Sequence, residues 1–87
     1  MYVILVYDVK TERVNKVNKY LRQYLYWRQN SVFEGEISKK TFNRLLTGLK
    51  RHLDLNADSV LIYTIPDKKR IDSILIGVEK GKIDRIV

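Results

Sequence analysis

Two hydrophobic patterns alternate along the chain, one typical of buried strands and the other of amphipathic helices. Residues 2–7 are β-branched, leucine or tyrosine without a polar position, which predicts a central strand covered on both faces. From Val14 to Leu25 the apolar residues recur every three or four positions, which predicts a helix with one core-facing stripe. Thr11 is expected to be the N-cap of this helix.

The middle of the chain repeats this succession of strand and helix. Residues 26–37 hold two short apolar segments around a polar turn, which predicts a hairpin of two strands. Ser38 is expected to cap a second helix, whose apolar residues from Phe42 to Leu53 again share one face. Gly48 costs this helix about 1 kcal/mol relative to alanine, and the sequence does not explain its presence.

The last third of the chain predicts further strands. Residues 60–65 form a densely apolar segment that we expect to stop at Pro66. Residues 73–78 predict another strand, and the alternation in 82–87 fits an edge strand with one wet face. The order β-α-β-β-α-β with a C-terminal extra strand predicts one α+β domain over 1–87, a ferredoxin-like sandwich with both helices on one face of an antiparallel sheet.

The other face of this sheet would be bare, although its central strands are apolar on both sides. Two helices cover only one face, and the simplest cover for the second face is another copy of the same sheet. We therefore expect a homodimer, with the C-terminal strand of residues 78–87 packing on the partner subunit.

Composition narrows the classes of function. The chain has 87 residues, no cysteine and a single histidine. A disulfide framework, a thiolate zinc site, a cysteine nucleophile and a metal site of several histidines are thereby excluded within one chain. The longest apolar run is far shorter than the ~20 residues that span a bilayer, and no signal peptide is visible. We expect a cytoplasmic protein without a membrane segment.

The charge predicts an anionic partner. The chain carries 17 Lys and Arg against 10 Asp and Glu, a net charge of +7, which favours nucleic acid first and an anionic membrane surface second. More than half of the basic residues lie in the two predicted helices. Basic side chains there can contact phosphates without reading base sequence, although soluble helices often carry solvated lysine and arginine. Arg13, Lys16 and Lys19 are the candidates on the first helix.

Asp8 is the candidate catalytic residue. It ends the first strand beside the first helix, where an aspartate is commonly a turn or capping residue. Its carboxylate could instead be a ligand of Mg²⁺ or Mn²⁺, which favour oxygen ligands. One carboxylate does not build such a site. In a two-fold dimer two copies of Asp8 could share a cation that positions a phosphodiester and activates water.

Three segments together resemble a known family. Residues 2–9, 28–35 and 58–63 look like the CRISPR-associated adaptation protein "two", the small ferredoxin-like partner of the spacer integrase. The resemblance covers residues 2–65 in the right order and spacing, and the segment 29–34 is its most specific part.

The resemblance implies roles for particular residues. In that family the acid that closes the first strand, here Asp8, is the proposed metal-binding catalytic residue. Arg28 matches an arginine of the family's second strand, so the resemblance implies a nucleic-acid contact there. Tyr7 and Phe33 match the family's aromatic positions and are expected to support the site. The stretch 10–13 departs from the family, because it holds one arginine where many members carry two.

Three functions stay open at this point. The first is a Mg²⁺-dependent endonuclease of the CRISPR spacer-acquisition machinery that cleaves RNA or DNA through paired Asp8. The second is a non-catalytic homodimeric adaptor that binds duplex DNA and bridges dimers of the CRISPR integrase protein. The third is a toxin-like ribonuclease or another ferredoxin-like RNA-binding protein, which would not need the segment 29–34.

Overall fold

The computed structural model describes residues 1–67 and 70–79. Its elements are β1 (Tyr2–Asp8), α1 (Thr11–Leu21), β2 (Tyr26–Gln29), β3 (Val32–Glu36), α2 (Lys39–Leu49), the 3₁₀ helix η1 (Lys50–His52), β4 (Ser59–Asp67) and β5 (Arg70–Gly77). This order confirms the predicted ferredoxin-like arrangement with an extra C-terminal strand. The predicted edge strand of residues 82–87 lies outside the described residues.

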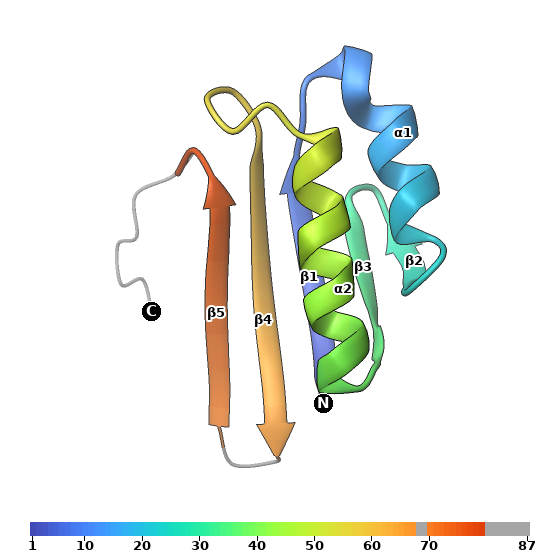
Figure 1. The fold of residues 1–87 in the computed structure, drawn as a ribbon, viewed down its shortest axis with the longest axis vertical. Helices are drawn as coiled ribbons and strands as arrows, with labels where there is room; N and C mark the ends of the chain where they lie inside the picture. The colour runs from blue at the N-terminus through green and yellow to red at the C-terminus, as the bar shows by residue number, and fades with distance from the viewer. Residues whose placement is uncertain (68–69, 80–87) are drawn as a thin grey trace.

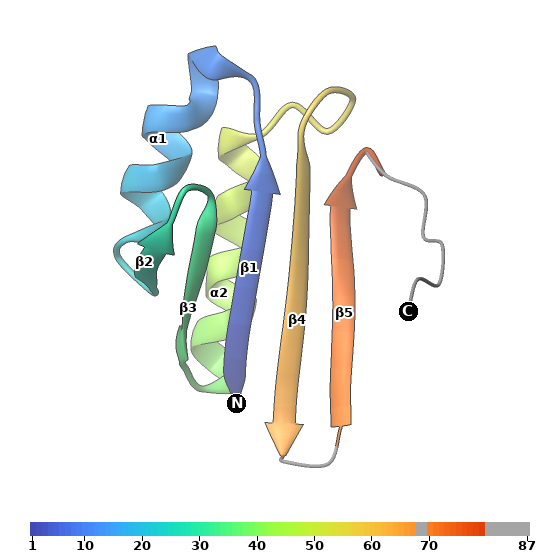
Figure 2. The same cartoon turned by 180° about the vertical axis from the view of Figure 1, so that it is seen from behind.

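The strands form one sheet in the order β2-β3-β1-β4-β5, and every neighbouring pair is antiparallel. Both helices lie on the same side of this sheet, in front of it in Figure 1 and behind it in Figure 2. Strand β1 is central, with β3 on one side and β4 on the other. Since β1 and β4 run in opposite directions, the end of β1 meets the beginning of β4.

The core lies between the sheet and the helices. Val3, Leu5 and Tyr7 point from β1 toward the helices and are buried, and Phe33 joins them from β3. The other side chains of β1 alternate to the opposite side. We call that side the open face. Its apolar members are Tyr2, Ile4, Val6, Val32, Leu61, Tyr63, Ile65 and Leu75, as the ladder registers place them. In a single copy β1 is therefore covered by the helices on one face only, and the predicted cover of its second face is not part of this copy.

The first helix differs from its prediction at both ends. Its N-cap is Lys10, not Thr11, and no side chain caps it. The Lys10 main-chain amide donates to the Asp58 carboxylate over 3.0 Å, so a distant residue holds the start of the helix although no side chain caps it. The helix ends at Leu21, and a turn with Leu25 N donating to Leu21 O over 2.9 Å keeps Leu25 in the core.

Two other local predictions have opposite outcomes. Ser38 caps α2 as predicted, because its hydroxyl accepts a hydrogen bond of 3.1 Å from Thr41 N. The expected stop at Pro66 is wrong, since β4 continues to Asp67. The ladder between β4 and β5 shifts register between Thr64 and Asp67. Pro66 thus lies where pairing is already irregular, which is where a strand tolerates a residue without an N–H.

Candidate active site

Asp8 closes β1 at the edge of the sheet. Its partner across the ladder is Ser59, the first residue of β4. The alternation along β1 places the Asp8 side chain on the open face with Ile4 and Val6, and this side chain is exposed. An acid therefore stands at the border of a largely apolar surface.

The two aromatic residues expected to support the site pack behind the end of β1. Tyr7 and Phe33 are both buried, with ring centroids 6.1 Å apart. The Tyr7 hydroxyl accepts a long hydrogen bond of 3.4 Å from Asn18 Nδ2, and Tyr7 N donates to Ser31 O over 3.1 Å. These contacts hold the strand end that carries Asp8.

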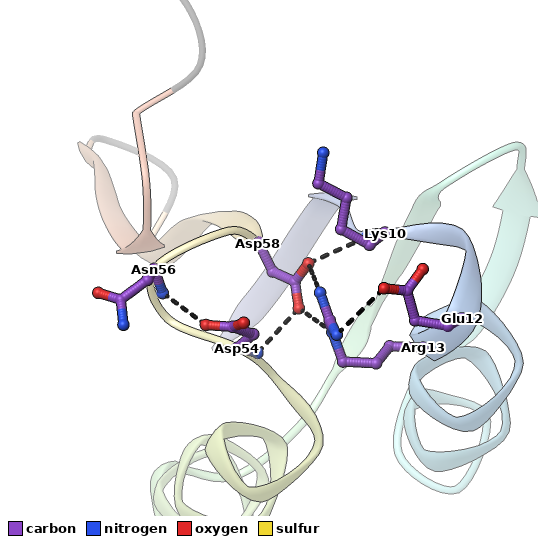
Figure 3. A network of polar contacts seen from close by, with 6 residues as sticks. All are labelled: Lys10, Glu12, Arg13, Asp54, Asn56 and Asp58. Carbon is purple, nitrogen blue, oxygen red and sulfur yellow. Dashed lines mark hydrogen bonds and ion pairs between the residues drawn. The ribbon is translucent and has the colours of Figure 1, made fainter.

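A buried ion pair lies beside the end of β1 (Figure 3). Asp58 has no exposed surface, and Arg13 donates to it twice, from Nε to Oδ2 over 2.6 Å and from Nη2 to Oδ1 over 2.9 Å. Lys10 N donates to Oδ1 over 3.0 Å, and Asp54 N donates to Oδ2 over 2.9 Å. Each carboxylate oxygen therefore accepts two hydrogen bonds.

This arrangement favours the charged forms of both partners. The hydrogen bonds from Arg13 hold the pKa of Asp58 well below its usual range, the Asp54 and Lys10 amides add to this effect, and burial opposes it. The same hydrogen bonding raises the pKa of Arg13. The expected contact of Arg13 with nucleic acid stays a prediction, and in this structure its guanidinium binds Asp58.

Arg28 lies in β2, the edge strand that is separated from β1 by β3. Its Nε is 2.8 Å from Glu34 Oε2, and the Tyr2 hydroxyl donates to Glu34 Oε1 over 2.9 Å, which raises the pKa of Tyr2. The Arg28 side chain is 62% exposed. A nucleic-acid contact by Arg28 stays a prediction.

Lys16 and Lys19 are exposed on α1. This helix covers the sheet face opposite to the open face (Figures 1 and 2), so these lysines and Asp8 do not share one face of a single copy. Their expected phosphate contacts stay a prediction.

Among the described residues, Asp8 does not belong to a group of three or more side chains that could hold a metal ion. Within residues 1–67 and 70–79 no three His, Asp or Glu side chains gather where they could hold a metal ion. A cation at Asp8 could take a further carboxylate from the Asp8 of a second copy, as expected from the sequence. None of the helices in the same ranges is long and apolar enough to cross a membrane.

Asp58 is the residue at this edge whose contacts were not expected. An aspartate before a strand is typical of a turn, and nothing near Asp58 in the sequence indicates its partners Lys10 and Arg13. A signal was available in the topology. In the predicted fold the end of the first strand meets the beginning of the strand that Asp58 precedes, so Asp58 had to lie near the segment after Asp8.

Relatives of known name match the whole chain. A protein of Pyrococcus furiosus named "CRISPR-associated endoribonuclease Cas2" is 48% identical over 87 residues, which is 100% of both chains. A protein of the same name from Methanocaldococcus jannaschii is also 48% identical over 87 residues, with 100% of this chain and 76% of that protein covered.

A solved structure and a family model agree with these relatives. The structure titled "Crystal structure of cas2" superposes with a TM-score of 0.74 at 52% identity, covering 100% of this chain and 98% of that chain. The family model described as "CRISPR associated protein Cas2" matches residues 1–72. With the fold, the exposed acid at the end of β1 and these matches together, the chain belongs to the CRISPR-associated protein Cas2 family.

Proposed function

We propose that this protein is a metal-dependent endonuclease of the CRISPR spacer-acquisition machinery, cleaving phosphodiester bonds of RNA or DNA through Asp8 from each of two copies. The observation that carries the proposal is the exposed Asp8 carboxylate at the border of the open face. The names of the relatives, which call them endoribonucleases, support the same activity.

The open face explains why two copies would be needed. Its central positions are apolar, and large side chains such as Tyr63 and Leu75 are 37% and 41% exposed in a single copy. A second copy packed on this face would bury them in an interface that uses the same patch on both subunits. Asp8 borders that patch, so a two-fold axis that passes near the end of β1 would bring the two Asp8 side chains toward each other.

The donor set fits a hard cation. Mg²⁺ usually takes one or two carboxylates and completes its coordination with water and substrate phosphate, which is what two Asp8 side chains could provide. A bound Mg²⁺ or Mn²⁺ would supply Lewis-acid polarisation of the phosphoryl group and a water of lowered pKa. Lys16 and Lys19, with Arg28, would attract and position the phosphate backbone.

The test replaces Asp8 and a matched acid. Asp8→Asn should lower the cleavage rate at least about a thousandfold, since a metal contributes several kcal/mol of charge stabilisation, while binding of the same oligonucleotide persists. Glu79→Gln removes one exposed negative charge outside the sheet and should cleave normally. A chelator should stop the reaction, and added Mg²⁺ or Mn²⁺ should restore it. Undiminished cleavage by Asp8→Asn would refute the assignment.

A second function is favoured by the exposed basic residues of the helices. Lys16, Lys19, Lys40 and Arg44 all lie at exposed positions, which suits a homodimeric adaptor that holds duplex DNA between integrase dimers without cleaving it. In that case Asp8→Asn should leave spacer acquisition in cells unchanged, whereas Lys16→Glu with Lys19→Glu should abolish it. The two variants together decide between cutting and holding.

A further inference from the structure

Asp58 joins three segments of the chain that are far apart in sequence. Its carboxylate accepts hydrogen bonds from Lys10 N in the β1–α1 connection and from Asp54 N in the segment before β4. Its main-chain oxygen accepts from Val78 N over 2.9 Å, directly after β5. Gly77 has φ +100°, and a Cβ there would collide with that same Asp58 oxygen.

The position of Asp8 depends on the segments that meet at Asp58. Asp8 pairs with Ser59, the residue after Asp58, and Lys10 lies two residues beyond Asp8. The backbone of Asp8 is therefore held on one side by its pairing with Ser59 and on the other by the β1–α1 connection. Ser59 directly follows Asp58, and the connection is hydrogen-bonded to the Asp58 carboxylate.

We propose that Asp58 and Arg13 form a clamp that positions Asp8, with Arg13 serving as a positioning residue and not as a phosphate contact. The proposal rests on the proposed function of Asp8. In one copy the Arg13 side chain is 25% exposed, and Nε and Nη2 are both directed at Asp58.

The chemistry of the pair makes the clamp stiff. A buried carboxylate is stable only when its hydrogen-bonding capacity is filled, and here two main-chain amides and the Arg13 fork fill it. The planar guanidinium supplies two parallel donors in a fixed geometry. A lysine at the same place keeps the charge but has no such fork.

The first experiment compares the loss of one charge at two positions of α1. Arg13→Gln should raise the Mg²⁺ concentration for half-maximal cleavage about 10- to 100-fold, the usual effect of removing a residue that orients a metal ligand. It should leave the slope of log binding affinity against log salt unchanged. Lys16→Gln, a matched change at an exposed lysine, should keep the metal midpoint and lower that slope by about one.

Arg13→Lys separates positioning from charge. A phosphate contact would tolerate lysine, whereas the clamp needs the fork, so the metal midpoint of Arg13→Lys should shift nearly as far as that of Arg13→Gln. Asp58→Asn should shift it as well, and adding Arg13→Gln to Asp58→Asn should change it little further, because the pair acts as a unit. Measurements well below each melting temperature keep loss of folded protein out of the comparison.

Hydrogen exchange tests the clamp without catalysis. In Arg13→Gln and Arg13→Lys the amides of Lys10 and Asp54 should exchange at least about tenfold faster, while amides in the centre of β1 are unaffected. If the wild-type protein does not cleave, the proposed function fails, and the exchange and salt measurements still decide the clamp. Unchanged exchange at Lys10 together with a lower salt slope for Arg13→Gln would overturn it.

Discussion

At the scale of single residues, the contribution of Asp58 to the stability of the fold depends on its negative charge. It is fully buried, and Arg13 with two main-chain amides holds its pKa below the usual range. The unfolded chain would have an aspartate pKa of about 3.9. A group whose folded pKa is depressed contributes stability above the unfolded pKa and loses that contribution as the pH falls toward the folded pKa.

The prediction for this residue is therefore a loss of stability in acid. The free energy of unfolding that Asp58 contributes should be complete above about pH 5 and should fall below about pH 4. Asp58→Asn should lower the free energy of unfolding at pH 7 by about 2 to 3 kcal/mol, because the buried amide loses the charge-assisted hydrogen bonds and turns an N–H toward other donors. Denaturant unfolding of both proteins at pH 7, 5, 4 and 3 measures the difference. Since other carboxylates titrate equally in both, a difference that stays constant from pH 7 to pH 3 would contradict the argument.

At the scale of elements, the packing of α1 against α2 explains Gly48. Tyr20 lies on α1, and its hydroxyl donates a hydrogen bond of 2.9 Å to Leu45 O on α2. The same hydroxyl is 3.3 Å from Arg44 O. A Cβ at Gly48 would overlap the Tyr20 hydroxyl and come within 2.7 Å of its Cζ. The glycine thus provides the space in which the Tyr20 ring joins the two helices, and burial raises the pKa of that phenol to about 12.

This contact reverses the usual effect of a helical glycine. Gly48→Ala should destabilise the protein by about 1 to 3 kcal/mol through overpacking, although alanine favours an isolated helix by about 1 kcal/mol. In a Tyr20→Leu background, which removes the ring, Gly48→Ala should stabilise instead. Thermal unfolding of the four proteins of this cycle gives both signs. An increase in melting temperature for Gly48→Ala alone would show that the helices can separate at little cost.

At the scale of the whole molecule, local patterns predicted the elements and long-range contacts decided the rest. The strand of β1, the hairpin of residues 26–37 and the Ser38 cap each follow from residues close in sequence, and they are confirmed. The contact of Asp58 with the start of α1 was missed because Lys10 and Asp58 are 48 positions apart. The spacing of apolar residues does not indicate such a contact. It can be inferred only once β1 and β4 are known to pair in antiparallel orientation.

The same division holds for the site. The place of Asp8 at a strand end could be predicted, since it directly follows the apolar run of residues 2–7, but its exposure could not, because that run has no polar position to show which face is open. The guanidinium of Arg13 could not be assigned in the same way, because a helix pattern shows which residues face outward but not which distant acid meets them. The helix pattern places Arg13 among the outward-facing basic residues. In the structure its guanidinium pairs with the buried Asp58 carboxylate.

The homodimer is the prediction that belongs to the whole molecule. Leu61 lies on the open face opposite Val6 and Leu75, where a second copy would bury it. Leu61→Asp should raise the dimer dissociation constant at least about a hundredfold, since an unpaired carboxylate in an apolar interface costs several kcal/mol. Leu55→Asp makes the same change at a residue that is 47% exposed outside the sheet, and it should leave the dimer intact.

Light scattering at micromolar concentration measures the dimer, and a cleavage assay at the same concentrations tests what the dimer does. If two Asp8 side chains make one site, activity per chain should fall in parallel with the dimer fraction as wild type and Leu61→Asp are diluted. Mixing wild type with an excess of Asp8→Asn should then suppress cleavage further, because mixed dimers carry one acid. A wild-type monomer at micromolar concentration, or full activity per chain in monomeric Leu61→Asp, would mean that Asp8 works alone and that the open face serves another purpose.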